Sequence, residues 1–267
     1  MKNVKKTAYS LLAITAILIS IVLAVQFLTK NDASYSSKPK AAIVDGLINY
    51  PSSAFVNESV KILSDAGYVV DYIGNEMVTV DFYKRLPSLG YDLIVLRVHC
   101  GPLFRRLSDG TEIPEGTVLF TTELYDTKKY VGYQVDGDVA IAEINGVPNE
   151  RYFAVPPWFF ERSAEGRFPN STIILDSCYG FYEYAPLMMA QAFTERGARV
   201  YVGWDGEVQA QHTDAVILTL LRALYGDRLA LSEAIERAMS EKGTDPYYQS
   251  VLLFYPDEMA DYRPGVR

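Results

Sequence analysis

The chain contains two cysteines and two histidines, and one of each follows an apolar run that predicts a buried strand. Cys178 comes after the run at residues 173–175, and His99 comes after the run at 93–96. A cysteine nucleophile needs a nearby base or a positive field to populate its thiolate, and imidazole titrates near neutral pH. The pair could therefore form a Cys/His dyad. The alternatives are that Cys178 is a buried, inert thiol and that His212 is the working base.

Strand and helix patterns alternate from residue 41 onward and predict an α/β domain. Short apolar runs predict strands at 41–48, 68–74, 92–100, 171–178, 198–204 and 250–256, and amphipathic segments predict helices at 53–67, 183–196, 209–225 and 231–242. This order favours a mostly parallel sheet with helices on both faces. Strands expected at 117–123 and 137–144 suggest a small antiparallel insertion at the edge of the sheet.

Polar residues follow several of these predicted strands, at the end where parallel sheets bind ligands. They should share one rim of the sheet: Asp45, His99, Cys100, Asp176, Cys178 and Asp205.

The N-terminal residues 1–30 differ from the remainder of the chain. Residues 7–28 carry no charge, and a helix of 22 residues is about 33 Å long, enough to cross a bilayer core of about 30 Å. A cleaved signal peptide is the alternative, but its apolar region is shorter and ends in a small-residue cleavage site. We therefore expect a single-pass membrane anchor at 1–30, with the N-terminus cytoplasmic by the positive-inside rule, a linker at 31–40 and an external domain at 41–267.

Composition excludes some classes of function. The net charge is −8 and the pI is near 4.9, whereas a nucleic-acid-binding protein usually carries a basic stripe. Two histidines and two cysteines without close spacing do not suggest a metal site. We expect no nucleic-acid partner, no metal and no cofactor, and calcium activation is left open.

The segments RVHCGP and LDSCYG, at 97–102 and 175–180, resemble the site motifs of the caspase-like fold shared by caspases, metacaspases, gingipains and CHAT-type peptidases. Three further segments resemble this group, at 153–162, 197–208 and 250–258. In that fold the histidine follows the third strand and the cysteine follows the fourth. The resemblance implies a cysteine endopeptidase acting on a peptide or protein substrate. Cys178 would attack the scissile carbonyl, His99 would protonate the leaving amine, and the N–H groups of Cys178 and Gly101 would hold the oxyanion.

Cys100 departs from the family pattern, because it places the glycine one residue later than usual. Cys100 could also form a disulfide with Cys178, since neighbouring strands are close enough for one. The alternative, which alternation along a strand favours, is that Cys100 points away from His99 and is simply buried.

Substrate preference follows from the same resemblance. Asp176, two residues before the cysteine, and Asp45, at the end of the first strand, match acids that select Arg or Lys in metacaspases. The alternative is that each aspartate caps a helix or a turn. A catalytically inactive, membrane-tethered binding or scaffold domain of the same fold is the competing function, because fold alone does not establish activity.

Overall fold

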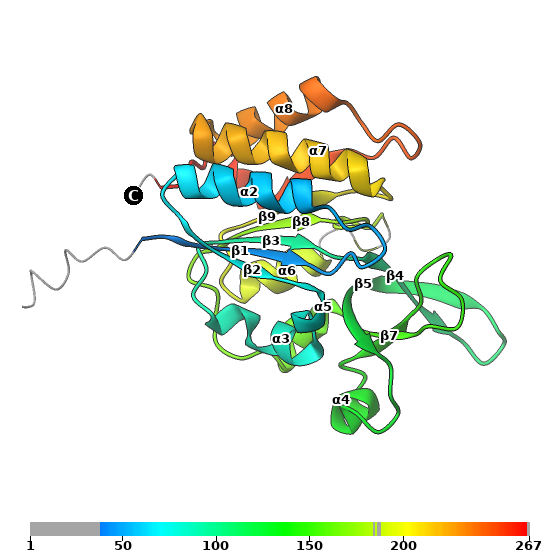
Figure 1. Cartoon of the computed structure of the whole chain (residues 1–267). Helices are drawn as coiled ribbons and strands as arrows, with labels where there is room; N and C mark the ends of the chain where they lie inside the picture. Colours follow the sequence, from blue (N-terminus) through cyan, green and yellow to red (C-terminus); the bar gives the residue numbers. More distant parts are fainter. Residues whose placement is uncertain (1–37, 184, 186–187, 266–267) are drawn as a thin grey trace, which may run out of the picture. The chain divides into compact units, whose positions relative to one another are not determined.

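A six-stranded sheet, sheet A, lies at the centre of the computed structural model, which describes residues 38–183, 185 and 188–265 (Figure 1). Its strands lie in the order β2-β1-β3-β8-β9-β10. Their bounds are β1 (Lys40–Asp45), β2 (Val69–Ile73), β3 (Leu93–Arg97), β8 (Thr172–Asp176), β9 (Val200–Trp204) and β10 (Leu252–Tyr255). The first five strands pair in parallel and β10 runs antiparallel to β9, so the sheet is mixed.

Helices cover both faces of sheet A, as the alternating pattern predicts. One face is covered by α2 (Ser53–Asp65), α7 (Ala210–Leu221) and α8 (Leu231–Lys242), and the opposite face by α3 (Val80–Arg85), α5 (Pro157–Arg162) and α6 (Met188–Glu195) (Figure 1). Because side chains alternate along a strand, Val95 packs in one core and its neighbour Leu96 in the other. Burial on both faces explains why the central strands are almost continuously apolar.

Shorter helical turns complete the α/β part of the chain. They are η1 (Asn75–Met77), η2 (Leu86–Ser88), the π-helical turn η3 (Arg222–Gly226) and η4 (Asp257–Met259). Pro87 lies within η2, directly after α3. Proline lacks the N–H that would continue the α-helix, and α3 ends before it.

The antiparallel part is larger than expected and forms a separate four-stranded sheet, sheet B, in the order β4-β5-β7-β6. Its elements are β4 (Cys100–Arg106), β5 (Glu112–Leu124), β6 (Ala140–Ala142) and β7 (Tyr152–Val155), with α4 (Val131–Asp136) between β5 and β6. The predicted insertion at the edge of the main sheet is therefore wrong in form. The physical reason lies at His99, where the chain leaves sheet A and enters β4. The His99 carbonyl accepts a hydrogen bond of 2.9 Å from the Phe120 N–H in β5, which starts the pairing of sheet B.

The expected fold class included a membrane-spanning helix, and the expected localisation was that of a single-pass membrane protein. The described residues do not support either expectation. Within residues 38–183, 185 and 188–265, the structure contains no helix that is both long and apolar enough to cross a bilayer. The longest helix there, α2, has 13 residues and is therefore about 20 Å long, short of the roughly 30 Å hydrocarbon core. The segment at 7–28 and the linker expected at 31–40 lie outside the described residues, apart from the last three residues of the linker.

Candidate active site

His99 and Cys178 follow neighbouring parallel strands at equivalent positions. Strand β3 pairs with β8 so that Arg97 lies opposite Asp176, and His99 and Cys178 each come two residues later. Both residues line one cavity of about 640 Å³. Both motifs therefore lie beyond the carboxyl ends of paired strands, at one cavity.

The turn that carries Cys178 is shaped by a strained residue and by a close backbone contact. Tyr179 has φ of 54°, a left-handed conformation that is uncommon for residues other than glycine. Gly180 follows, and a Cβ there would lie 3.0 Å from the Cα of Gly203 in β9. The Tyr179 N–H donates to the Gly206 carbonyl at 2.8 Å. The turn is therefore held against the segment after β9, and it places the half-buried thiol at the cavity.

The Cys178 thiol both accepts a hydrogen bond from the backbone of Val208 and donates one to it. The Val208 N–H donates to Sγ at 3.4 Å, and Sγ donates to the Val208 carbonyl at 3.5 Å. Burial raises the pKa of Cys178, and the nearby Glu207 and Asp245 carboxylates raise it further, while the Val208 backbone opposes the shift. The resting thiol is therefore protonated at neutral pH.

His99 is held between two aromatic rings that also line the cavity. Its ring centroid lies 6.2 Å from that of Tyr50 and 5.8 Å from that of Phe120. Its Nε2 atom is buried and has no hydrogen-bond partner among the described residues. Burial, with the positive charge of Arg97, lowers the pKa of His99 to about 4. The imidazole is thus neutral at pH 7 and, in the resting structure, a weaker base than an ordinary histidine.

His212, the alternative base, lies elsewhere on α7. Its ring contacts Trp204, with centroids 5.7 Å apart, and its Nε2 lies 3.2 Å from the Gly243 carbonyl. It is not among the residues that line the cavity. The geometry therefore favours His99 as the partner of Cys178.

Arg97, which the sequence reasoning did not single out, occupies the place expected for a substrate cation. Its side chain is 1% exposed and donates to Asp45 Oδ1 at 2.7 Å and to both carboxylate oxygens of Asp214, at 2.7 and 3.1 Å. A further hydrogen bond of 2.7 Å reaches the Tyr50 carbonyl. Burial alone would lower the pKa of Arg97, but Asp214, with Asp176 and Asp45, raises it overall. The guanidinium therefore stays charged and bound to the chain's own carboxylates.

Asp45 and Asp176, the two carboxyl groups expected in the substrate pocket, belong to this buried cluster. Asp45 is held by Arg97 and is not among the residues that line the cavity. Asp176 does line it but is fully buried, and its Oδ1 accepts a hydrogen bond of 2.5 Å from Thr213. Burial, with the charge of Asp214, raises the pKa of Asp176 well above its usual range. Asp176 Oδ2 has no hydrogen-bond partner among the described residues, but full burial and the raised pKa keep this group from presenting an exposed carboxylate to the cavity.

Glu207 is a second residue that the sequence reasoning missed. It lies beside Val208, lines the cavity, and its Oε1 accepts a hydrogen bond of 2.7 Å from the Tyr179 hydroxyl. The signal that could have found it is its position in the polar segment directly after β9. In an α/β sheet that segment lies at the same edge as the residues after β3 and β8.

Gly101 and Cys100 lie at the start of β4, beside the cavity. Because His99 and Phe120 are a hydrogen-bonded pair and such pairs alternate along an antiparallel ladder, Gly101 opposite Val118 is the next one. Its N–H therefore points toward β5. The Cys100 thiol is buried, and both cysteines are free. Cys100 Sγ lies 3.9 Å from the Tyr179 carbonyl, on the turn that carries Cys178.

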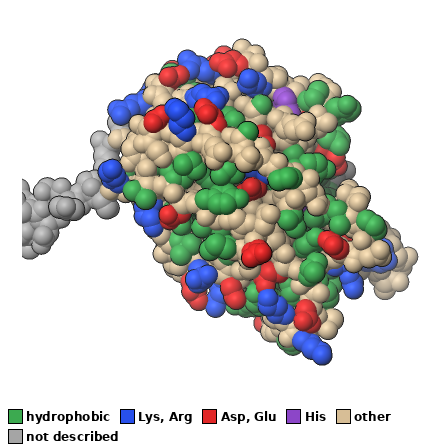
Figure 2. Space-filling model, viewed as in Figure 1, with side chains coloured by type: hydrophobic (Ala, Val, Ile, Leu, Met, Phe, Trp, Pro, Cys, Tyr) green, Lys and Arg blue, Asp and Glu red, His purple; other side chains and the backbone are tan. Residues whose placement is uncertain are grey.

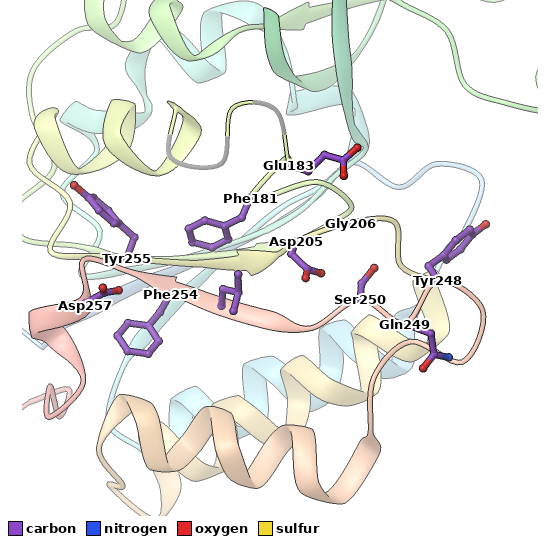
Figure 3. Close-up of a pocket in the computed structure, with 11 residues that line it drawn as sticks. Phe181, Glu183, Asp205, Gly206, Tyr248, Gln249, Ser250, Phe254, Tyr255 and Asp257 are labelled. Atoms are coloured by element: carbon purple, nitrogen blue, oxygen red, sulfur yellow. The ribbon is translucent and has the colours of Figure 1, made fainter. Parts of the chain in front are cut away.

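Asp205 lines a different cavity, of about 560 Å³, next to the edge strand β10 (Figure 3). Its carboxylate accepts a hydrogen bond of 2.8 Å from the Val251 N–H. This cavity contains neither Cys178 nor His99, and it shares Tyr248 with the first one. Of the residues expected at one rim, Asp45 and Asp205 therefore lie outside the cavity that Cys178 and His99 line.

Metal and anion chemistry receive little support from the described part of the chain. Within it, no cluster of three or more His, Cys, Asp or Glu side chains is arranged to hold a metal ion. Basic and acidic side chains are interspersed on the face shown in Figure 2, where the coloured residues form no broad basic patch.

In comparisons with known proteins, no family model and no curated protein matches this chain.

Proposed function

We propose that this protein is a cysteine-type endopeptidase of the caspase-like kind, in which Cys178 is the nucleophile and His99 is the general base and acid. One observation carries the proposal: a thiol and a neutral imidazole follow paired parallel strands at matching positions and line the same cavity. The strand order agrees with the resemblance. In chain order β3 is the third strand of sheet A and precedes His99, and β8 is the fourth and precedes Cys178.

The reaction would begin from a neutral pair. His99 Nε2 accepts the thiol proton as Cys178 Sγ bonds to the scissile carbonyl carbon. The C–N bond then breaks, and the imidazolium returns the proton to the leaving amine. Water adds to the thioester, and the acid product departs as the thiol is restored. The Nε2 atom of His99 has no competing hydrogen-bond partner among the described residues, but the lowered pKa of His99 and the raised pKa of Cys178 mean that substrate must change their surroundings before the proton moves.

Stabilisation of the oxyanion falls to backbone N–H groups near the nucleophile. The Cys178 N–H is the leading candidate, because it belongs to the left-handed turn that carries the thiol. The N–H groups of Gly101 and Tyr179 are directed elsewhere in the resting structure, toward β5 and the Gly206 carbonyl. Gly101 would serve only if the start of β4 opened when substrate binds.

An inactive binding domain is the second candidate, and a specific observation favours it. The Cys178 thiol is bonded to the Val208 backbone, and burial and acidic neighbours hold its pKa above the ordinary value. A thiol in this state is a weak nucleophile unless substrate changes its surroundings. The same cavity could then bind a peptide without cleaving it.

Labelling with a peptidyl acyloxymethyl ketone distinguishes these candidates. A panel of probes with different P1 residues is offered to the wild-type chain, to Cys178→Ala and to the matched control Cys100→Ala. A peptidase is labelled in the wild type and in Cys100→Ala but not in Cys178→Ala, and it cleaves the corresponding peptide substrates. Absence of both labelling and cleavage by folded wild-type protein would refute the peptidase and favour the binding domain.

A further inference from the structure

The cavity beside Cys178 and His99 is lined by several acidic side chains and, among the described residues, by no Lys or Arg. Its lining includes the carboxyl groups of Glu143, Asp176 and Glu207. Asp176 is buried inside the cluster around Arg97, so it does not present a charge to a ligand. Glu143 and Glu207 remain as the two carboxylates that a bound molecule can reach.

The two glutamates differ in how firmly they are placed. Glu143 is exposed and follows the short edge strand β6. Glu207 is half-buried, and three contacts hold its segment: the Tyr179 hydroxyl donates to its carboxylate at 2.7 Å, the Ser250 hydroxyl donates to its carbonyl at 2.5 Å, and the next residue bonds the Cys178 thiol. A carboxylate positioned in this way can bind a ligand group with little further loss of side-chain freedom.

Aromatic rings accompany this carboxylate. Tyr50, Phe120, Tyr179 and Tyr248 all line the cavity. Aromatic faces attract cations, and a carboxylate accepts charge-assisted hydrogen bonds from an ammonium or guanidinium group. The combination suits a cationic side chain better than an anionic or a purely apolar one.

We propose that Glu207 is the residue that selects substrates by binding a lysine or arginine side chain next to the scissile bond. This inference rests on the proposed peptidase function and assigns its specificity. It places recognition on the segment after β9 and not on Asp45 and Asp176, because Asp45 is paired with Arg97 and Asp176 is fully buried.

Substrates that differ in charge but little in shape test the proposal. Two sets of peptides are compared as substrates, one with arginine at P1 and one with its neutral isostere citrulline. The flanking residues are identical mixtures in both sets. The kcat/KM of the wild-type chain is measured for each set. The wild type should prefer arginine by at least about tenfold, the effect of one charge-assisted hydrogen-bonded pair. Glu207→Gln, whose amide oxygen can still accept from Tyr179, should reduce this ratio to near one. Glu236→Gln, an exposed position on α8 outside the cavity, is the matched control and should leave the ratio unchanged.

A binding arm separates failure of this inference from failure of the peptidase proposal. The same peptides carry a fluorophore and are titrated into the full chain with Cys178→Ala, alone and combined with Glu207→Gln, while thermal unfolding confirms that the variants fold. Tighter binding of arginine than citrulline that is lost with Glu207→Gln supports the inference even if no cleavage occurs. An arginine-to-citrulline ratio that Glu207→Gln leaves unchanged in the binding titration overturns it. So does wild-type protein that does not discriminate between the two peptides.

Discussion

Replacement of Arg97 by methionine tests whether the buried charge cluster beneath the candidate site stabilises the fold. Arg97 joins the end of β3 to Asp45 on β1 and to Asp214 on α7. Methionine preserves much of the apolar volume but removes the guanidinium. Asp45 and Asp214, whose side chains are only 9% and 12% exposed, would then be left without their cation.

The expected loss is large because the remaining charges are buried. Four hydrogen bonds of 2.7 to 3.1 Å from the guanidinium disappear. Removing one partner of a buried ion pair costs about 3–5 kcal/mol. We therefore expect the free energy of unfolding to fall by about 3–5 kcal/mol, and the thermal midpoint to fall by roughly 6–20 °C for a domain of this size.

Urea unfolding followed by circular dichroism measures this change. Arg222→Met is the matched control, because Arg222 pairs with Glu58 at 2.9 Å but its side chain is 51% exposed, and an exposed pair contributes less than about 1 kcal/mol. A triple variant that combines Arg97→Met with Asp45→Asn and Asp214→Asn should recover most of the stability, since both carboxylates that pair with Arg97 are neutralised with it and burial already favours the protonated form of Asp176. A loss below about 1 kcal/mol in Arg97→Met, or no recovery in the triple variant, would refute the reasoning.

Three further predictions concern charge and pH. Glu207→Gln removes a carboxylate that raises the pKa of Cys178, so the pH profile of Cys178 alkylation by iodoacetamide should move to lower pH. Asp245, which acts on Cys178 in the same direction, and Tyr179 remain in that variant. A pH profile that does not move contradicts the prediction. His99 has a pKa lowered to about 4 in the folded chain, so its contribution to stability is present above pH 6.5 and is lost as the pH falls toward 4. Unfolding curves of His99→Gln should therefore show a smaller loss of unfolding free energy over that pH window than the wild type. Equal losses in the two proteins would contradict the prediction. Burial would raise the pKa of Asp245, but hydrogen bonds from the N–H groups of Gln209, Tyr248 and Tyr247 lower it overall. Asp245 therefore stabilises the fold above the pKa of an unfolded aspartate, and this stabilisation is lost as the pH falls through the lowered value. The free energy of unfolding of Asp245→Asn should vary less with pH over that range, and an unchanged slope would count against this account.

Local pattern was sufficient for the main elements of sheet A. The expected helix at 231–242 agrees with α8, and the expected strands at 68–74 and 198–204 contain β2 and β9. These segments are specified by short-range features, namely helical periodicity or continuous apolar runs, which are visible in the chain itself. Sheet B was harder to predict, because the strand expected at 92–100 divides at Val98 and His99 between the two sheets. That division depends on pairing with β5, which lies further along the chain.

The chain by itself therefore determined the α/β class and placed His99 and Cys178 at strand ends, because both properties follow from residues that are neighbours in sequence. Only the tertiary structure decided which groups face the cavity. Arg97 reaches Asp214 across 117 positions of the chain and Asp45 across 52, Asp176 is fully buried against Thr213, and Glu207 stays available at the cavity. No local pattern encodes such a choice, since a buried cation selects its partners by distance and desolvation in the folded chain.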